Sequence, residues 1–383
     1  MHERGYTILF GTTIPYQLRY HQGLEWQLAQ RGWNIHFASA DGPELWDLGS
    51  KPRVTSHALP MSRKPSPLED CRALLAWVRL LRRVRPDVVV LGTPKASLLG
   101  LMAAAVVRIP TRIYEVHGLR LEGETGLKHK ILQWVERATC ALATDIVPVS
   151  RSLRDALVGR RIARSSKLHR LGAGSPNGVD VMTFTEAQAN HVQKRMTRER
   201  HKVDPAIPLI LFVGRMNEDK GLTCLAKACE LVARRHHVQL MIVGPVDDST
   251  GESGLNRIRG SGVRVITTGE VNDVAPLYAI ADVFCLPSKR EGLPTVILEA
   301  FAASIPVVAT AATGIIDLVA HEETGMLVAI DDHEALAEGM LRLIEDRALR
   351  ETLVKNALHL VEAQFTRTDI QTKWVEWLES FVE

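Results

Sequence analysis

Short apolar runs alternate with longer amphipathic segments along almost the whole chain. Several of the runs end at a glycine, and the segments between them repeat apolar residues at helical spacing. Strands are expected at 6–10, 34–39, 54–59, 87–91, 111–116, 145–149, 167–171, 207–213, 238–243, 263–267, 282–286 and 306–309. Helices are expected at 18–31, 67–85, 95–108, 127–143, 221–235, 293–303 and 366–383. Continuous apolar strands alternating with helices are typical of parallel sheets covered on both faces.

The alternation stops between residues 175 and 206, where Pro176, Asn177 and Gly178 mark a turn before a polar, basic stretch. We therefore predict an N-terminal domain at 1–180 and a second domain at 203–365. Both are α/β and doubly wound, and they are expected to face each other across a cleft. In such sheets ligands bind at the carboxyl ends of the strands.

Two helices carry apolar stripes that predict burial. In 127–143 the stripe comprises Leu127, Ile131, Trp134, Val135, Ala138 and Leu142, the spacing of one buried helical face. The last helix, 366–383, carries Ile370, Trp374, Trp377, Leu378 and Phe381. The pattern does not indicate which domain this last helix docks on.

Composition fits two folded domains. The chain has 383 residues, of which 46% are hydrophobic and 24% charged, which excludes wholesale disorder. Aromatic residues make up only 5%, which weakens a base-stacking interpretation. The net charge of +3 is too small to indicate nucleic acid. Lys and Arg nevertheless exceed Asp and Glu at 61–90 and 151–202, which indicates solvated faces or a face for an anionic membrane or phosphorylated substrate.

Several classes of site are disfavoured. The five cysteines form no Cys-x-x-Cys pair, so a disulfide framework or zinc site is not expected and a reducing cytoplasm fits. The longest apolar stretch, 98–107, is too short to span a bilayer, and no signal peptide is visible. The first strand is not followed by Gly-x-Gly-x-x-Gly, which disfavours a dehydrogenase. The pairs Asp247-Asp248 and Asp331-Asp332 are interpreted as solvated turns rather than metal ligands.

Two segments of the second domain suggest anion binding. Glu291 and Gly292 precede a helix that begins near Pro294 and contains Glu299 in an otherwise apolar sequence. Free amides and the dipole at a helix start favour an anion, and a buried carboxylate needs hydrogen bonds. Two surface glutamates are the alternative, for Glu291 above all.

The other segment begins at Gly214 and contains Arg215 and Lys220, at the end of an apolar strand. Two cations there suit a diphosphate, although a solvated turn explains them equally. In the first domain, His117 follows the strand at 111–116 and is either structural or part of the cleft.

Together these segments resemble the family 4 glycosyltransferases, the retaining Glu-x7-Glu enzymes of GT-B fold. The resemblance rests on 213–221, 281–288, 291–300, 306–310 and 324–328. In the first domain, 93–96, 116–122 and 172–180 resemble a bacterial subgroup. Most members of that subgroup build capsule, exopolysaccharide, O-antigen or other glycan precursors on polyprenyl-diphosphate carriers.

The resemblance implies the donor site. Arg215 and Lys220 would bind the diphosphate of a nucleotide sugar, a UDP-sugar by family habit. Glu291 would bind the sugar, Glu299 the ribose, and His117 would line the transferred sugar. The full donor set is Gly11, Thr12, Gly214, Arg215, Lys220, Glu291, Gly292, Leu293 and Glu299. The catalytic set is His117, Arg215, Lys220 and Glu291.

The mechanism implied by the family is front-face transfer with retention, in which the leaving phosphate accepts the proton of the acceptor hydroxyl. Side-chain cations would replace a metal, so no metal or cofactor is expected. Arg63, Lys95 and Arg120 are candidates for an acceptor diphosphate, with solvated loops as the alternative. The expected location is the cytoplasm, with peripheral contact to an anionic membrane.

The sequence departs from the family pattern in three loops. Gly11 stands alone where a glycine pair is frequent, Ser304 and Ile305 stand where glycine is common, and the later Gly-x-x-Glu pattern ends in Asp317. These departures put loop shape in doubt, but not the reaction class. Three other functions remain open: a transferase with a soluble acceptor such as an aglycone, a sugar-nucleotide epimerase, and a nucleotide-sugar-binding subunit without activity.

Overall fold

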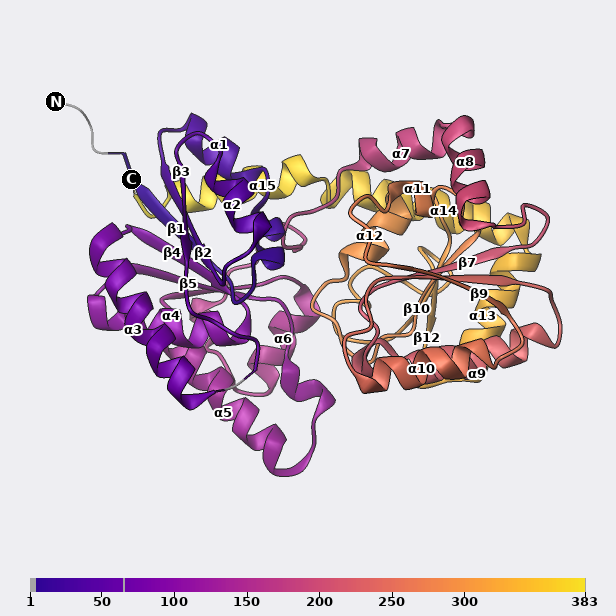
Figure 1. The fold of residues 1–383 in the computed structure, drawn as a ribbon, viewed down its shortest axis with the longest axis horizontal. Coiled ribbons are helices and arrows are strands. Elements are labelled where there is room, and N and C mark those ends of the chain that lie inside the picture. The colour runs from indigo at the N-terminus through magenta and orange to yellow at the C-terminus, as the bar shows by residue number, and fades with distance from the viewer. Residues whose placement is uncertain (1–4, 65, 383) are drawn as a thin grey trace. The chain divides into compact units, whose positions relative to one another are not determined.

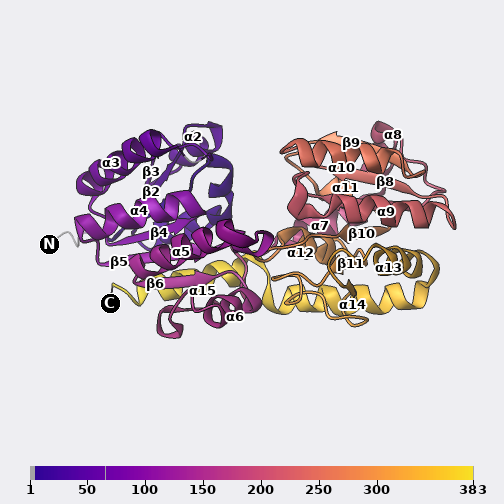
Figure 2. The same cartoon turned by 90° about the horizontal axis from the view of Figure 1, so that it is seen from below.

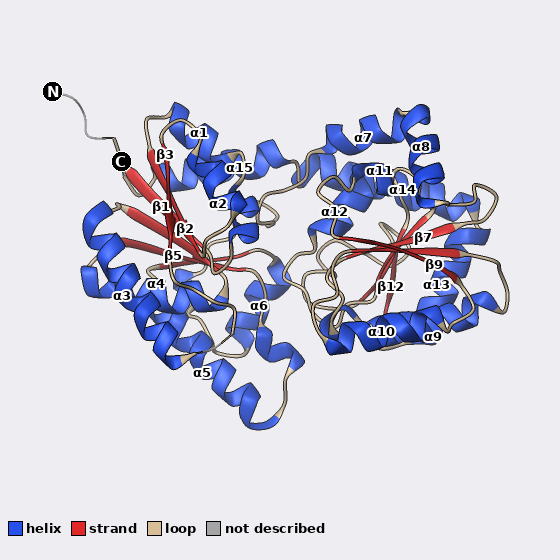
Figure 3. Ribbon diagram, viewed as in Figure 1, coloured by secondary structure: helices blue, strands red, loops and turns tan. Residues whose placement is uncertain are grey.

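The computed structural model describes residues 5–64 and 66–382. It contains two compact units, one formed by the chain up to Asn177 and from Thr368 onward, the other by Gly178–Arg367. Each unit has a six-stranded parallel sheet with helices on both faces, as Figures 1 and 3 show. The predicted α/β class with two doubly wound units is thereby confirmed.

The first sheet has the strand order β3-β2-β1-β4-β5-β6. Its strands are β1 (Thr7–Gly11), β2 (Asn34–Ser39), β3 (Val54–Ala58), β4 (Val88–Gly92), β5 (Thr111–Val116) and β6 (Asp145–Pro148). Its helices are α1 (Leu24–Gln30), α2 (Pro43–Gly49), α3 (Pro67–Val84), α4 (Pro94–Val107), α5 (Gly126–Leu142), α6 (Arg151–Gly159) and α15 (Arg367–Glu379). Short 3₁₀ helices span Pro15–His21, Arg120–Gly123 and Ser165–Lys167.

The second sheet has the order β12-β11-β10-β7-β8-β9. Its strands are β7 (Leu209–Val213), β8 (Gln239–Val243), β9 (Arg264–Gly269), β10 (Val283–Leu286), β11 (Val307–Thr310) and β12 (Met326–Val328). Its helices are α7 (Val181–Ala189), α8 (His191–His201), α9 (Leu222–Ala233), α10 (Ser249–Arg259), α11 (Ala275–Tyr278), α12 (Thr295–Ala302), α13 (His333–Glu345) and α14 (Arg347–Gln364). A 3₁₀ turn spans Glu218–Lys220.

One apolar core cluster of the first unit lies between its sheet and the helices α1, α2 and α15. Ile8 pairs in register with Ile35 on one side and Val88 on the other, so their side chains share one face of the sheet. On that face they pack with Ile370 and Trp374 of α15. The C-terminal helix, which the sequence left unassigned, therefore belongs to the first unit, whereas α14 belongs to the second (Figure 2).

Three predicted segments differ in the structure. The strand expected at 167–171 is absent, because Ser165–Lys167 forms a 3₁₀ helix and only an isolated bridge joins Leu168 to Ile146. The single helix expected at 18–31 is divided into a 3₁₀ helix, Pro15–His21, and the α1 helix, because Gly23 between them adopts φ 96°. The polar segment at 175–206, where the sequence predicted no helix, contains α7 and α8.

The predicted burial of the α5 stripe is wrong. Leu127, Ile131 and Trp134 are exposed, whereas Glu136 on another face of the same helix is buried. Periodicity locates a stripe but does not say what covers it. Within the part of the chain that the structure describes, no helix is both long and apolar enough to cross a membrane.

Candidate functional site

The strand order of each sheet reverses at one point, which is where ligands bind in doubly wound folds. In the second unit this point lies between β7 and β10, which pair with each other. The loop after β7 contains Gly214, Arg215 and Lys220, and the loop after β10 leads through Glu291 to α12. The topology thus brings together the two loops that the sequence identified.

An ion pair joins these two loops. Lys220 Nζ lies 2.5 Å from Glu291 Oε1, and the two side chains are only 18% and 13% exposed. Partial burial strengthens their attraction relative to a fully solvated pair. The structure therefore places the predicted cation and the predicted carboxylate in direct contact.

A second contact between the loops involves residues that sequence reasoning missed. The Arg290 guanidinium donates two hydrogen bonds to the Asp219 carboxylate, one of them from Nε at 2.8 Å. The amide of Lys289 also donates to the Asp219 carbonyl at 2.7 Å. Both residues lie beside predicted site residues, but only the fold shows that they pair, because 71 residues separate Arg290 from Asp219.

Gly221 closes the first of these loops in a way that only glycine permits. Its φ is 67°, and a Cβ atom there would lie 1.9 Å from the carbonyl oxygen of Pro287. At Gly214, by contrast, the nearest atom to an added Cβ would be 3.5 Å away. Packing within the protein therefore does not require a glycine at 214.

Arg215 has a carboxylate partner. Its Nη1 donates to Asp247 Oδ2, which also accepts a hydrogen bond from Asn217 Nδ2 at 3.2 Å. Asp248, the other member of this acidic pair, caps α10 by accepting from the amides of Thr250 and Gly251. The acidic pair thus orients Arg215 and begins a helix. Among the described residues, no group of three or more His, Cys, Asp or Glu side chains could hold a metal.

The start of α12 is held by a close backbone contact. Gly292 and Leu293 are buried, and a Cβ atom at Gly314, where φ is 79°, would lie 2.1 Å from the Gly292 carbonyl oxygen. Glu299 is half-buried rather than buried, and its Oε2 accepts from the Tyr278 hydroxyl at 3.0 Å. Tyr278 is a partner of Glu299 that the sequence did not indicate.

At the equivalent point of the first unit, Gly11 ends β1 and is followed by Thr12. A Cβ at Gly11 would lie 2.5 Å from Leu91 Cδ2 and 2.6 Å from the Trp77 ring, so core packing alone explains this glycine. Thr12 is buried, and its hydroxyl donates to the Ile14 carbonyl at 2.9 Å.

His117 belongs to a cluster of ionisable side chains around the buried Glu115. Glu115 Oε2, at the end of β5, lies 3.3 Å from His117 Nε2 and 3.0 Å from His21 Nε2. Burial by itself would raise the pKa of Glu115, but the two imidazoles outweigh it and lower the pKa to about 2. The other face of the cluster is Tyr20, whose ring stacks on His117 at 4.8 Å. Glu115 and Tyr20 therefore hold the His117 ring in place, and His21 in turn holds Glu115.

The predicted acceptor residues lie on three segments of the first unit, and Lys95 belongs to the first turn of α4. Lys95 Nζ pairs with Asp70 Oδ1 at 2.6 Å and donates to the Lys64 carbonyl, one residue from the exposed Arg63. Arg120 is exposed at the start of a 3₁₀ helix. Lys95 is already neutralised by a carboxylate, so an acceptor phosphate would compete with Asp70.

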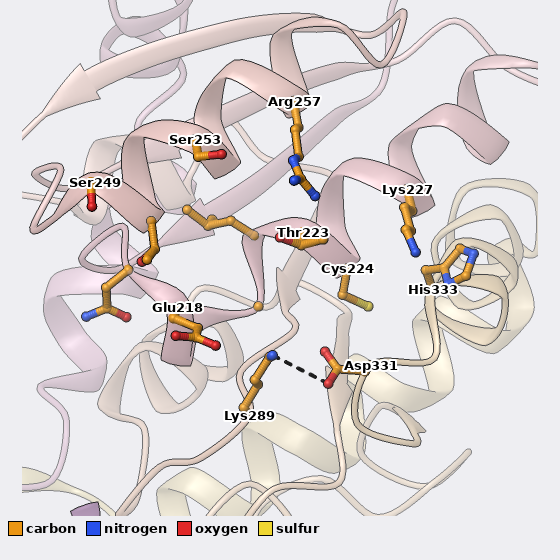
Figure 4. Close-up of a pocket in the computed structure, with 14 residues that line it drawn as sticks. Glu218, Thr223, Cys224, Lys227, Ser249, Ser253, Arg257, Lys289, Asp331 and His333 are labelled. Carbon is orange, nitrogen blue, oxygen red and sulfur yellow. Dashed lines mark ion pairs between the residues drawn. The ribbon is translucent and has the colours of Figure 1, made fainter. Parts of the chain in front are cut away.

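A separate cavity of about 550 Å³ opens between α9, α10 and the segment before α13 (Figure 4). The side chains of Arg257 and Lys227 point into it, and Lys289 Nζ lies 3.5 Å from Asp331 Oδ2 at its edge. It is lined by none of the four residues Arg215, Lys220, Glu291 and Glu299. The loop 214–221 contributes Asn217, Glu218 and Gly221 to the lining of this cavity.

Family comparisons cover most of both units. Residues 19–174 match the family described as "Glycosyl transferase 4-like domain", and residues 207–346 match "Glycosyl transferases group 1". The second match includes Arg215, Lys220, Glu291 and Glu299, and the first includes His117.

Individual proteins agree with these matches. The chain is 34% identical to "Capsular polysaccharide biosynthesis glycosyltransferase CapM" of Staphylococcus aureus, over 92% of this chain and 90% of that protein. It is 23% identical to "UDP-Gal:alpha-D-GlcNAc-diphosphoundecaprenol alpha-1,3-galactosyltransferase" of Escherichia coli, over 76% and 74%. The solved structure of sucrose-phosphate synthase from Thermosynechococcus elongatus superimposes with a TM-score of 0.81, 22% identity and coverage of 98% and 99%. Two doubly wound units, the ion-paired loops at the switch point and these likenesses lead to one assignment: the chain belongs to the family 4 glycosyltransferases of GT-B fold and is a transferase enzyme.

Proposed function

We propose that this glycosyltransferase moves a sugar from a UDP-sugar to a hydroxyl of a polyprenyl-diphosphate-linked saccharide, with retention, in polysaccharide assembly. The observation that carries the donor half is the Lys220–Glu291 pair at the switch point of the second unit. A cation and a carboxylate held together suit a ligand with an anionic diphosphate next to a polyhydroxyl sugar.

Each residue of the donor set then has a task. Lys220 and Arg215 bind the diphosphate and stabilise the charge that develops as it leaves. Glu291 accepts hydrogen bonds from the sugar, Glu299 binds the ribose, and the amides of Gly292 and Leu293 face the phosphate or sugar. On the first unit we assign His117 to the transferred sugar, and Gly11 and Thr12 to the diphosphate.

Side-chain cations supply the charge stabilisation in this scheme, so we propose transfer without a metal. The proton of the acceptor hydroxyl passes to the leaving phosphate oxygen as the new glycosidic bond forms. The sugar–phosphate bond breaks on the same face, which preserves the anomeric configuration. Arg63, Lys95 and Arg120 are proposed to meet the acceptor diphosphate, and Lys95 would exchange Asp70 for it.

Two likenesses support the acceptor. The name of the Escherichia coli relative includes a UDP-sugar and a diphosphoundecaprenol-linked sugar. The name of the Staphylococcus aureus relative includes capsular polysaccharide. A polyprenyl carrier is held in a bilayer, so the enzyme would work at a membrane surface. Peripheral contact with an anionic membrane is therefore part of the proposal.

The test uses the purified full chain, bacterial membrane vesicles and a panel of labelled UDP-sugars. We expect label from one donor to enter the organic-solvent phase. Lys220→Ala should lower the rate by about 10²–10³, the loss typical of one preorganised charge-stabilising group. Lys227→Ala is the matched control, because Lys227 lies in the separate cavity and should leave the rate unchanged.

Other outcomes would correct particular parts of the proposal. Near-normal turnover by Lys220→Ala would remove its charge-stabilising role. Release of UDP only when soluble sugars or aglycones are added would keep the transferase and reject the lipid-linked acceptor. Formation of an altered UDP-sugar without any acceptor would indicate an epimerase.

A further inference from the structure

Helix α5 lies at the outside of the first unit in Figure 1. Three of its large apolar side chains are exposed to solvent. Leu127, Ile131 and Trp134 are 74%, 54% and 71% exposed. At 3.6 residues per turn these three positions share one stripe along the helix. A contiguous apolar stripe of this kind on a water-soluble unit marks an interaction surface.

The opposite face of α5, which packs against the rest of the unit, contains an ionisable residue. It buries Glu136, whose Oε1 accepts a hydrogen bond from the Tyr114 hydroxyl at 2.7 Å. Burying a carboxylate while exposing Leu, Ile and Trp is unfavourable for a helix that meets only water on its outer side. The helix is therefore built to meet something apolar on its outer face.

Cations border the stripe. The turn after α6 lies beside α5, because Gln133 Nε2 donates to the Arg160 carbonyl at 3.3 Å and Arg137 Nε donates to the Arg161 carbonyl at 3.1 Å. Lys130, the residue before Ile131, is exposed, and so is Arg164, which lines a small cavity together with Arg137 of α5. The bordering cations are Lys128, Lys130, Arg137, Arg160, Arg161 and Arg164.

Two carboxylates partly offset this charge. Glu124 pairs with Lys128, and Glu122 Oε1 lies 3.8 Å from Arg160 Nη2. The six cations thus outnumber the two carboxylates by four. The border is therefore positively charged around an apolar centre.

We propose that the α5 surface, which comprises Leu127, Ile131, Trp134 and the six bordering cations, docks on an anionic lipid bilayer. A helix lying in the interface buries its apolar face at the level of the headgroups while Lys and Arg contact lipid phosphates. The Trp134 ring suits this position, because aromatic rings with a polar edge favour the interface.

A second copy of the chain fits this surface less well. A symmetric pair would place the same patch on both sides, so the cationic borders would face each other and repel. An anionic bilayer complements the border instead. This inference deepens the proposed function. It rests on that function only for the reason why the enzyme approaches a membrane.

The first measurement is co-sedimentation of the full chain with phosphatidylcholine vesicles that contain phosphatidylglycerol. We expect binding at low salt, and a loss of at least about tenfold in the partition coefficient for Ile131→Ser with Trp134→Ser. Trp26→Ser is the matched control, because Trp26 is 65% exposed on α1, outside the α5 surface, and it should bind as the wild type does.

The charged border is tested separately. Lys130→Gln and Arg164→Gln should each weaken binding to the anionic vesicles by about fivefold, the effect of one cation near such a surface. Added salt should weaken wild-type binding in the same way, and vesicles of phosphatidylcholine alone should show little difference among these proteins. Wild-type tryptophan emission should shift to the blue on binding, and Trp134→Phe should reduce this shift while the protein still binds.

Unchanged binding by the Ile131→Ser, Trp134→Ser variant, with its thermal unfolding intact, would overturn the inference. A wild-type dimer that this variant converts to a monomer, without an effect on vesicles, would overturn it in favour of a second copy. Sugar transfer to a detergent-dispersed acceptor distinguishes the two proposals. Lost vesicle binding with intact transfer in detergent supports the docking surface, whereas intact binding without any transfer by the wild type would reject the proposed function alone.

Discussion

At the scale of single residues, the proposed donor site sets an incoming diphosphate in competition with the Glu291 carboxylate for the charge of the Lys220 ammonium group. In the free enzyme this ammonium group lies 2.5 Å from the carboxylate, which offsets part of its charge. Glu291→Gln removes the competing charge, so we expect UDP to bind several-fold more tightly, by roughly 1 kcal/mol. Turnover with the UDP-sugar should nevertheless fall, because the sugar loses a charged acceptor. Calorimetric titration with UDP and steady-state kinetics measure the two effects.

The matched control is Glu218→Gln, which neutralises an exposed carboxylate in the loop that contains Lys220. It should change both quantities little, since Glu218 is exposed and lies outside the Lys220–Glu291 ion pair. Weaker binding of UDP by Glu291→Gln would mean that Glu291 does not compete for Lys220 in the free enzyme.

Sequence reasoning identified Arg215 but not its partner Asp247, and Glu299 but not Tyr278. The reason is geometric, because 32 residues separate Arg215 from Asp247 and 21 separate Tyr278 from Glu299. A motif indicates which residue types a ligand needs. The residues that hold them in place depend on which loops the sheet brings together, and local spacing does not contain that information.

At the scale of elements, α5 makes the stability of the first unit depend on pH. Burial raises the pKa of Glu136 from its usual 4.5 to about 7, against the hydrogen bond from Tyr114. Between these values the folded carboxyl keeps its proton while the unfolded one loses it, so stability falls as the pH rises. The fall should reach about 3 kcal/mol. Urea unfolding between pH 4.5 and 7 measures it, and Glu136→Gln should make the curve flatter.

Glu115 supplies the opposite case in the same unit. Its pKa is lowered to about 2, so its contribution to stability is present above its usual pKa of 4.5 and is lost as the pH falls toward 2. Glu115→Gln should therefore lower the free energy of unfolding near neutral pH. It should not remove the decline in stability between pH 4.5 and 7 that is assigned to Glu136. If stability still declines between pH 4.5 and 7 in Glu136→Gln, another group causes the decline.

The elements that the sequence missed share a physical cause. The α5 stripe has a correct helical period, but period alone does not distinguish a buried face from one that meets a different apolar medium. The 18–31 segment has a helical composition, yet Gly23 at φ 96° divides it. By contrast, strands such as β7 were predicted closely, because a run of apolar residues buried on both faces has few other stable environments.

At the scale of the whole molecule, the chain enters the second unit once and then returns. The predicted alternation of strands and helices was sufficient for two doubly wound sheets, because each strand and its crossover helix are local in sequence. The return of α15 was not predictable, since its apolar stripe suits either unit. Its assignment depends on contacts with β1 and β2, more than 300 residues away, such as those in the cluster around Ile8 and Ile370.

This return predicts which unit a core substitution weakens. Trp374 is 1% exposed in the core of the first unit, although the chain just before Thr368 belongs to the second. Trp374→Ala should destabilise the first unit by about 3–5 kcal/mol, through lost burial and the cavity left behind. Calorimetry with and without UDP separates the units, because UDP should raise only the transition of the unit that binds it.

We expect the transition that UDP does not move to shift downward in Trp374→Ala, while the other stays in place. Trp26→Ala, which removes an exposed ring from the same unit, should shift neither by more than about 0.5 kcal/mol. If both transitions fall together in Trp374→Ala, the units unfold as one cooperative block, and the two crossings of the chain between them transmit stability as well as connect them.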